Sequence, residues 1–198
     1  MLFVSAAPTA TQITMFAACV FVFASTTGVG AEERTAYYQI SGTTANELRQ
    51  AMDRLRPTGP DGKRHDAITT WDIPWRYHVV AVEGWCAVQS IEVSLDLVTT
   101  VPRWTNEAAA PAALAGQWRA YLAALAKHED GHKQLAIEAA AAVRDLGAHI
   151  KVPQRANCAE VGRTIDTAAK AVIQEYQAKE RQYDEETDYG RTQGARFP

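Results

Sequence analysis

The sequence predicts an α+β fold in which a short antiparallel sheet packs against two long helices. Between residues 67 and 101 apolar and polar residues alternate, which is typical of strands that bury one face and expose the other. Beyond residue 104 the chain becomes rich in alanine, and its large apolar residues recur at three- and four-residue steps, which is typical of helices. The sheet is therefore expected in the first half of the chain and the long helices in the second.

The first expected elements are a strand and a helix. Residues 35–40 are β-branched and aromatic, which predicts a strand. Thr43 or Thr44 can then cap a helix whose apolar side chains recur at helical spacing. Pro57 ends this helix, and residues 57–66, with two prolines and two glycines, are predicted to form a loop.

Two further strands are expected over residues 79–82 and 91–98. The first is a short apolar run, whereas the second alternates cleanly between apolar and polar side chains. The apolar residues that share one face of the second strand are Ile91, Val93, Leu95 and Leu97. An antiparallel sheet with one face in water follows from this pattern.

The second half of the chain predicts two long helices. Pro111 suits the first turn of a helix that runs to about residue 150. Its expected buried seam consists of Trp118, Tyr121, Leu125, His128, His132, Leu135, Ala139, Val143 and Leu146. After a connection over residues 151–157, a second helix begins near Val161, and Gly190 is well placed to stop it.

Composition excludes several classes of protein. Hydrophobic residues make up 47% of the chain and charged residues 22%, which is typical of a folded globular protein and not of a disordered one. The net charge of -3 and the absence of a basic cluster argue against nucleic acid as a partner. The length of 198 residues fits one domain with or without a targeting segment.

The N-terminal segment predicts export. An apolar run over residues 15–24 has the length of a signal-peptide core, and Val29-Gly30-Ala31 resembles a signal-peptidase site. We therefore expect a signal peptide over residues 1–31, a single domain over residues 32–198, a periplasmic or secreted location, and no stable membrane span after cleavage. No lysine or arginine precedes the apolar run. The alternative is a buried N-terminal helix.

Removal of residues 1–31 leaves two cysteines, Cys86 and Cys158. Two cysteines in an oxidising compartment can pair, whereas in the cytosol they stay reduced. The sequence therefore predicts a Cys86–Cys158 disulfide. The alternative is two thiols that are buried separately.

The segment His128-Glu129-Asp130-Gly131-His132 matches the HExxH pattern of zinc peptidases. Two histidines four residues apart project from one face of a helix, where they can hold two corners of a zinc site. Glu129 lies beside them and can act as the general acid/base. Gly131 is unfavourable inside a helix and suggests that another element approaches closely there. The alternative is a hydrogen-bonded pair of core histidines without metal.

Short motifs follow one another along the chain in this order: Tyr37-Tyr38, Gly42-Thr43, Cys86, Pro102-Arg103-Trp104, Trp118, Tyr121, His128 to His132, and Tyr183-Asp184-x-x-Thr187. In this order they resemble the bacterial domain of unknown function 922 family, which is described as predicted secreted zinc-dependent proteases. The resemblance covers nearly everything after residue 31. It implies that His128 and His132 are zinc ligands and that Glu129 is the general acid/base.

A catalytic zinc needs a third protein ligand. The family pattern ends Tyr-Asp-x-x-Thr-x-His-Gly, and its histidine is the expected third ligand. Here Tyr189 stands at that position. The candidates are therefore the Tyr189 phenolate and a carboxylate from Asp184 or Asp188, and a weakened, non-catalytic site is the remaining alternative.

These observations predict an exported, zincin-like metallopeptidase that uses zinc and acts on a peptide or protein. The substrate is expected to lie antiparallel to an edge strand, for which residues 91–98 are the candidate. One alternative is a non-catalytic zinc- or peptide-binding envelope protein that keeps the same fold. Another is a helical-pair adaptor without metal.

Overall fold

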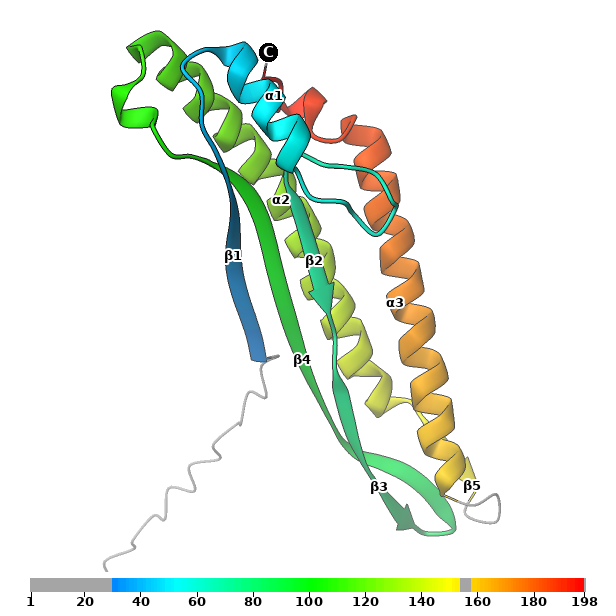
Figure 1. Ribbon diagram of the computed structural model, residues 1–198. Coiled ribbons are helices and arrows are strands. Elements are labelled where there is room, and N and C mark those ends of the chain that lie inside the picture. The colour runs from blue at the N-terminus through cyan, green and yellow to red at the C-terminus, as the bar shows by residue number, and fades with distance from the viewer. Residues whose placement is uncertain (1–29, 154–157, 198) are drawn as a thin grey trace, which may run out of the picture.

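The computed structural model describes residues 30–153 and 158–197 and has an α+β architecture with a small mixed sheet and three α-helices in that part of the chain (Figure 1). The predicted signal peptide, residues 1–31, lies outside the described residues except for Gly30 and Ala31, which begin the first strand. Among the helices that are described, none is long and apolar enough to cross a membrane.

A single long strand organises the sheet. The strands are β1 (Gly30–Ile40), β2 (Ile68–Asp72), β3 (Trp75–Val82), β4 (Trp85–Trp104) and β5 (Lys151–Pro153). β4 is central, with β1 on one side and β2 on the other along its second half, while β3 and β5 pair with its first part. β2, β3 and β5 run antiparallel to β4, as predicted.

The prediction of a wholly antiparallel sheet is wrong, because β1 runs parallel to β4. A helix and two strands separate β1 from β4 in the chain, so no hairpin dictates their relative direction. The choice of residues 91–98 as an edge strand is also wrong, because residues 94–98 have β1 on one side and residues 96–98 also have β2 on the other. β2 is an edge strand of this sheet instead.

The predicted alternation along β4 is confirmed. Val93, Leu95 and Leu97 are buried against the long helices, where they pack with alanines of both. Glu92, just before them, and Ser94, between Val93 and Leu95, are exposed. The strand is longer than the predicted 91–98, because pairing with β3 and β1 extends its ladder in both directions beyond the alternating segment.

The three helices are α1 (Ala45–Leu55), α2 (Ala112–Asp145) and α3 (Ala159–Thr187). Thr44 caps α1 as predicted, its hydroxyl accepting from the Glu47 amide at 3.2 Å while the Glu47 carboxylate accepts from the Thr43 amide at 2.6 Å. This reciprocal capping satisfies amide groups that a helix N-terminus otherwise leaves unpaired. α2 and α3 lie side by side along the sheet (Figure 1).

The end of α3 differs from the prediction that placed its stop at Gly190. The helix ends at Thr187, and Asp188, Tyr189 and Gly190 all adopt left-handed backbone conformations. The chain therefore turns sharply back toward α2. Phe197 then packs against Trp118 and Tyr121 in the core at this end of the molecule.

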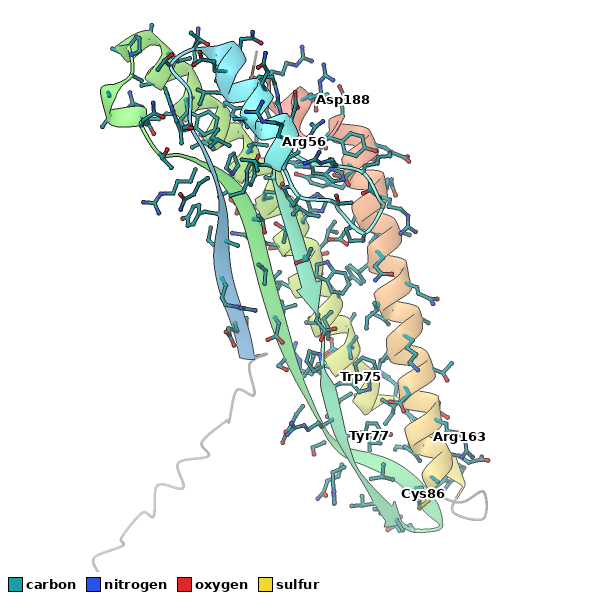
Figure 2. All side chains as sticks on the ribbon, viewed as in Figure 1. Arg56, Trp75, Tyr77, Cys86, Arg163 and Asp188 are labelled. Carbon is teal, nitrogen blue, oxygen red and sulfur yellow. A yellow bond between two sulfur atoms is a disulfide. The ribbon has the colours of Figure 1, made fainter. Side chains whose placement is uncertain are left out.

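The predicted disulfide is present and joins Cys86 at the start of β4 to Cys158 just before α3. Figure 2 shows Cys86 at the end of the molecule where α3 begins, whereas Arg56 and Asp188 lie near the opposite end. The bond ties the hairpin of β3 and β4 to the helical layer.

Asp66 fixes the predicted loop that precedes β2. Its carboxylate accepts two hydrogen bonds from Arg49, at 2.7 and 2.6 Å, and one from the Tyr121 hydroxyl at 2.6 Å. Burial alone would raise the pKa of Asp66, but the bonds from Arg49 and Tyr121 outweigh it and lower that pKa. The charged network ties the end of the loop to α1 and α2, and the loop passes near the end of α3 (Figure 1).

Candidate metal centre

The HExxH segment lies in the interior of α2, on the side that faces α3 and β2. His128, Glu129 and His132 are all buried, with exposed fractions of 4%, 2% and 8%. α3 brings Asp184 to the same place, so that ligand atoms of His128, His132 and Asp184 all lie within 4.8 Å of one another. The structure thus joins two predicted ligands to one of the three candidates for the third.

The distances within this group fit a metal ion. Asp184 Oδ1 lies 3.2 Å from His128 Nε2 and 3.1 Å from His132 Nε2. A tetrahedral zinc with bonds of about 2.0–2.2 Å separates its ligand atoms by roughly 3.3–3.6 Å. The two separations that involve Asp184 are therefore only a few tenths of an ångström from the spacing that zinc requires, and all three ligand atoms lie within 4.8 Å of one another.

The hydrogen-bond donors also point to a cation. His128 Nδ1 faces Gln193 Oε1 at 3.2 Å, and His132 Nδ1 faces Glu180 Oε1 at 3.5 Å, while both Nε2 atoms face the Asp184 carboxylate. Every ring nitrogen faces an oxygen, and the ring centroids are 4.9 Å apart, so protonation of both rings would place two positive charges side by side. A divalent cation satisfies both Nε2 atoms without that repulsion and leaves each Nδ1–H bonded to its own acceptor.

Without metal, the pKa values of this group reflect the carboxylates that surround the two histidines. Burial by itself lowers the pKa of His132, but hydrogen bonds to Asp184 and Glu180 outweigh it and raise that pKa to about 10. Burial likewise opposes ionisation of Asp184, yet the two histidines hold its pKa well below the usual range. The site therefore favours positive charge between these side chains.

Gly131 is explained by the side chain that crosses α2 at that point. A Cβ atom built on Gly131 would overlap the Tyr183 ring, with Tyr183 Cε1 only 2.7 Å away. Tyr183 stacks on the His128 ring at 5.1 Å between centroids and meets the His132 ring edge-on at 5.2 Å. The predicted close approach is thus confirmed, and it packs both histidine rings against one aromatic side chain.

Gly190 has the same role on the other side of His128. Its φ of +80° suits glycine, and an added Cβ would lie 2.9 Å from the His128 ring. The hydroxyl of Thr187 lies 3.4 Å from His128 Nδ1 and accepts from the Gly190 amide at 3.3 Å. The turn after α3 therefore closes directly onto the histidine.

Glu129 is held beside the histidines by a strand of the sheet. The Thr69 hydroxyl of β2 donates to Glu129 Oε2 at 2.7 Å. Burial raises the pKa of Glu129 above the ordinary value for a glutamate, although the bond from Thr69 and the nearby histidines act in the opposite sense. A buried carboxylate with a raised pKa next to a metal-ligand group is suited to proton transfer.

The other two candidate ligands lie further along the turn. The Tyr189 hydroxyl accepts from Lys63 Nζ at 2.7 Å, and its ring lies 5.7 Å from that of His65. Asp188 pairs with Arg191 at 3.5 Å. Both side chains thus have partners outside the His128, His132 and Asp184 group.

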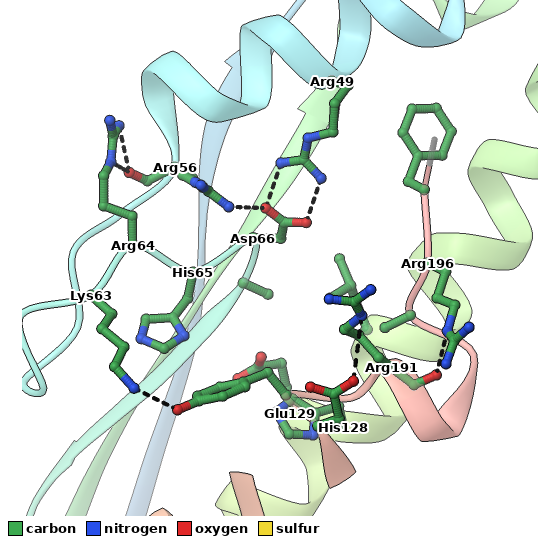
Figure 3. A pocket seen from close by; sticks show the side chains of 16 residues that line it. Arg49, Arg56, Lys63, Arg64, His65, Asp66, His128, Glu129, Arg191 and Arg196 are labelled. Atoms are coloured by element: carbon green, nitrogen blue, oxygen red, sulfur yellow. Dashed lines mark hydrogen bonds and ion pairs between the residues drawn. The ribbon is translucent and has the colours of Figure 1, made fainter. Parts of the chain in front are cut away.

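Two cavities meet at His128 and Glu129, and both are also bordered by His65 and Ala67. We call the first, of about 440 Å³, the basic chamber, because its walls include Arg49, Arg56, Lys63, Arg64, Arg191 and Arg196 (Figure 3). We call the second, of about 380 Å³, the acidic chamber, because Arg181 is joined there by Asp61, Glu129, Glu180 and Asp184. The cleft therefore opens to either side of the histidines.

Several residues of the site were not singled out by the sequence. Glu180 accepts from Trp71 Nε1 at 2.7 Å as well as facing His132, and it lies four residues before Asp184 on the same face of α3. This spacing is a signal that the sequence contains. Gln193 belongs to a polar tail without periodicity, and His65 and Thr69 reach the site only through the packing of β2 and its loop.

Comparison with known proteins gives one match. The family model described as "Bacterial protein of unknown function (DUF922)" matches residues 35–190. No curated protein and no solved structure matches the chain. The matched range includes the HExxH segment and all of α3.

Proposed function

The chain belongs to the DUF922 family of bacterial proteins of unknown function, and we propose that it is an exported zinc-dependent metallopeptidase. The observation that carries the proposal is that one carboxylate oxygen of Asp184 lies within 3.2 Å of Nε2 of both His128 and His132. The buried Glu129 borders the same cleft. This is the donor set and the neighbouring base that metal-assisted hydrolysis of a peptide bond needs.

We assign His128, His132 and Asp184 as the zinc ligands, in preference to Tyr189 or Asp188. Three protein ligands leave one position for water or substrate, which is the arrangement of a catalytic zinc and not of a structural one. Two histidines and one carboxylate are a donor set that binds catalytic zinc in peptidases. When bound, zinc would lower the pKa of a water and polarise the scissile carbonyl.

Glu129 would move the proton. Thr69 donates to Oε2, so Oε1 is the oxygen assigned to accept the proton of the attacking water and to return it to the leaving amine nitrogen. The raised pKa of Glu129 brings it nearer to neutral pH, where a base and its conjugate acid are both usable. Gln193 and Glu180 would hold the two histidine rings through their Nδ1 atoms.

The substrate would be an extended segment of a peptide or protein. β2 is an edge strand, and its residues 68–71 line the acidic chamber beside Glu129. An extended chain can add to such an edge through main-chain hydrogen bonds. This replaces the β4 segment that the sequence suggested.

The disulfide supports the proposal that the protein is exported. The Cys86–Cys158 bond is the kind that persists in oxidising compartments. A periplasmic or secreted location is therefore proposed with the peptidase. Fractionation of cells that produce the full chain tests it, and recovery of reduced protein in the cytosol would contradict it.

The decisive experiment compares purified full-length protein with Glu129→Gln. We expect about one zinc per chain in both, and hydrolysis of an unfolded protein such as casein only by the unsubstituted protein, with a loss of at least about a hundredfold in the variant. Glu160→Gln, at an exposed position in the first turn of α3, serves as the matched control. Absence of zinc, or equal hydrolysis by the variant, would overturn the proposal.

A different result would favour the alternative function. Zinc at one per chain with no hydrolysis of any tested protein or peptide is what a non-catalytic zinc- or peptide-binding envelope protein would give. The cleft and the ligand set are common to both functions, so zinc content alone does not separate them. Turnover does.

A further inference from the structure

The basic chamber has more positive charge than its own carboxylates neutralise. Six arginine and lysine side chains line it, against the three carboxylates of Asp66, Glu129 and Asp188. The chain as a whole has a net charge of -3, so this concentration of positive charge runs against the overall balance. A cleft lined by one sign of charge raises the local concentration of ligands of the opposite sign.

The three carboxylates are already engaged. Asp66 pairs with Arg49 at 2.6 Å and with Arg56 at 3.3 Å. Asp188 pairs with Arg191 at 3.5 Å, and the Glu129 carboxylate accepts from Thr69. These acidic groups therefore leave three basic residues without compensation.

The side chains of those three residues, Lys63, Arg64 and Arg196, bond only to uncharged oxygens within residues 30–153 and 158–197. Lys63 donates to the Tyr189 hydroxyl at 2.7 Å, and Arg196 Nε donates to the Arg191 carbonyl at 3.2 Å. Arg64 donates to main-chain carbonyls at the end of α1. None of the three charged side-chain groups has a carboxylate oxygen within 4.0 Å in that part of the chain, although the main-chain amide of Lys63 donates to Asp61.

The chamber also has more donors than acceptors. The Nε atoms of Arg49 and Arg56 are buried and have no hydrogen-bond partner among the described residues. Buried donors that lack a partner are uncommon in folded proteins and are often satisfied by a ligand or an ordered water. Both Nε atoms are covered by other protein atoms, whereas the uncompensated side chains of Lys63, Arg64 and Arg196 border the cavity next to His128 and Glu129.

We propose that the basic chamber binds a carboxylate of the substrate, so that the protein acts on peptides with an anionic group on one side of the scissile bond. The inference rests on the proposed function, because it names the substrate class of that same site. The carboxylate belongs either to an acidic side chain or to the C-terminus of the peptide. Arginine and lysine both bind this group strongly through charge-assisted hydrogen bonds.

The charges of the acidic chamber favour one orientation of an extended peptide in the cleft. The acidic chamber carries Asp61 and Glu180 in addition to Glu129 and Asp184, against the single cation Arg181. A carboxylate placed there would meet like charges, which is unfavourable. The two chambers therefore select which end of an extended peptide lies on which side of the histidines.

The test measures binding separately from turnover. Zinc-loaded Glu129→Gln protein is titrated with fluorescent peptide pools that differ only in Glu against Gln at every randomised position, each with a free or an amidated C-terminus. We expect the carboxylate-bearing pools to bind about tenfold more tightly, as one charge-assisted hydrogen bond in a partly buried site allows. The Glu/Gln pair and the acid/amide pair show which carboxylate is recognised.

Substitution of the uncompensated cations removes the preference if the chamber is the binding site. In Lys63→Gln with Arg196→Gln the carboxylate pools should bind no better than the neutral ones, while binding of the neutral pools stays the same. Arg163→Gln with Lys170→Gln removes the same charge from exposed positions on α3 and serves as the control. The preference should also weaken as salt is added.

Two results overturn the inference: equal binding of acidic and neutral pools, or a preference that survives loss of Lys63 and Arg196. Binding is measured on the Glu129→Gln protein, so these results do not depend on catalysis. Failure of the proposed function would appear elsewhere, as an absence of hydrolysis by the unsubstituted zinc-loaded protein. A carboxylate preference without hydrolysis would retain the binding site and reject the peptidase.

Discussion

Because Gly131 contacts Tyr183, replacing glycine by alanine should have opposite effects on the free energy of unfolding at two positions of α2, Gly131 and Gly116. Gly131→Ala should stabilise an isolated helix by about 1 kcal/mol, as Gly to Ala does in helix interiors. In the folded protein the new methyl group would overlap the Tyr183 ring. Overpacking of this kind costs about 1–3 kcal/mol. Three Tyr183 atoms would lie closer than 3.0 Å to the new methyl group, so the upper part of that range applies, about 2–3 kcal/mol, and we expect a net loss of roughly 1–2 kcal/mol.

Gly116 supplies the matched control. It also lies in α2, and a Cβ built there meets nothing within 4 Å. Gly116→Ala should therefore raise the free energy of unfolding by about 1 kcal/mol. For a domain of this size, thermal unfolding should shift upward by roughly 2–4 °C in Gly116→Ala and downward by roughly 2–8 °C in Gly131→Ala.

Zinc affinity provides the second measurement on the same variant. Tyr183 stacks on His128 and precedes Asp184, so its displacement disturbs two of the three proposed ligands. Residues that orient metal ligands typically change affinity by about 10–100-fold when altered. We expect a loss of that size in Gly131→Ala and none in Gly116→Ala, measured by competition with a zinc chelator.

A double variant tests whether overlap with the Tyr183 ring causes the loss of stability in Gly131→Ala. When Tyr183→Ala removes the ring, Gly131→Ala should become stabilising by about 1 kcal/mol, because only its helix propensity is left. The reasoning is refuted if Gly131→Ala and Gly116→Ala shift the unfolding temperature equally and Gly131→Ala keeps normal zinc affinity. It is also refuted if the Tyr183→Ala background does not reverse the sign.

Three further predictions concern stability. Asp66→Asn should cost about 2 kcal/mol at neutral pH, because the partly buried Arg49 and Arg56 lose the carboxylate that they share and keep only the more exposed Asp53. The folded-state pKa of Asp66 is lowered, so this difference in urea unfolding should be complete above about pH 4 and should shrink as the pH falls further. Replacing Cys86 and Cys158 by alanine should cost about 4 kcal/mol for a sequence separation of 72, and an unchanged urea midpoint would contradict it. Glu129→Gln should raise the free energy of unfolding of the chelated protein near pH 7, because ionisation of an acid whose folded-state pKa is raised destabilises the fold. The gain should vanish below about pH 4, where the carboxyl is protonated in both states.

Local patterns in the sequence predicted the elements and half of the site. The four-residue spacing of His128 and His132 fixes their common face once the segment is a helix, and their register with the buried seam of α2 placed them inside. The alternation of β4 likewise determined which of its side chains are buried. The parallel pairing of β1 could not be predicted, because it depends on the path of a long connection and not on any local pattern.

The choice among the three candidates for the third ligand depends on the backbone at the end of α3. Asp184 remains on the face of the helix that meets α2, together with Glu180, whereas the left-handed residues that begin at Asp188 turn Tyr189 toward Lys63. A left-handed conformation at Asp188 and Tyr189 is not evident from residue type, since glycine usually provides it. The family pattern therefore pointed to Tyr189, whereas the carboxylates that the structure brings to the histidines are Glu180 and Asp184, four residues apart on α3.

The assignment of His128, His132 and Asp184 as a zinc site is tested most directly by zinc affinity in two variants. Asp184→Ala removes the proposed third ligand, and Tyr189→Phe removes only the hydroxyl that bonds to Lys63. We predict one zinc per chain in the unsubstituted protein. Asp184→Ala should lose more than about a hundredfold in zinc affinity, which exceeds the effect of residues that only orient ligands. Tyr189→Phe should leave the zinc affinity unchanged. Normal affinity in Asp184→Ala, or a comparable loss in Tyr189→Phe, would contradict the assignment.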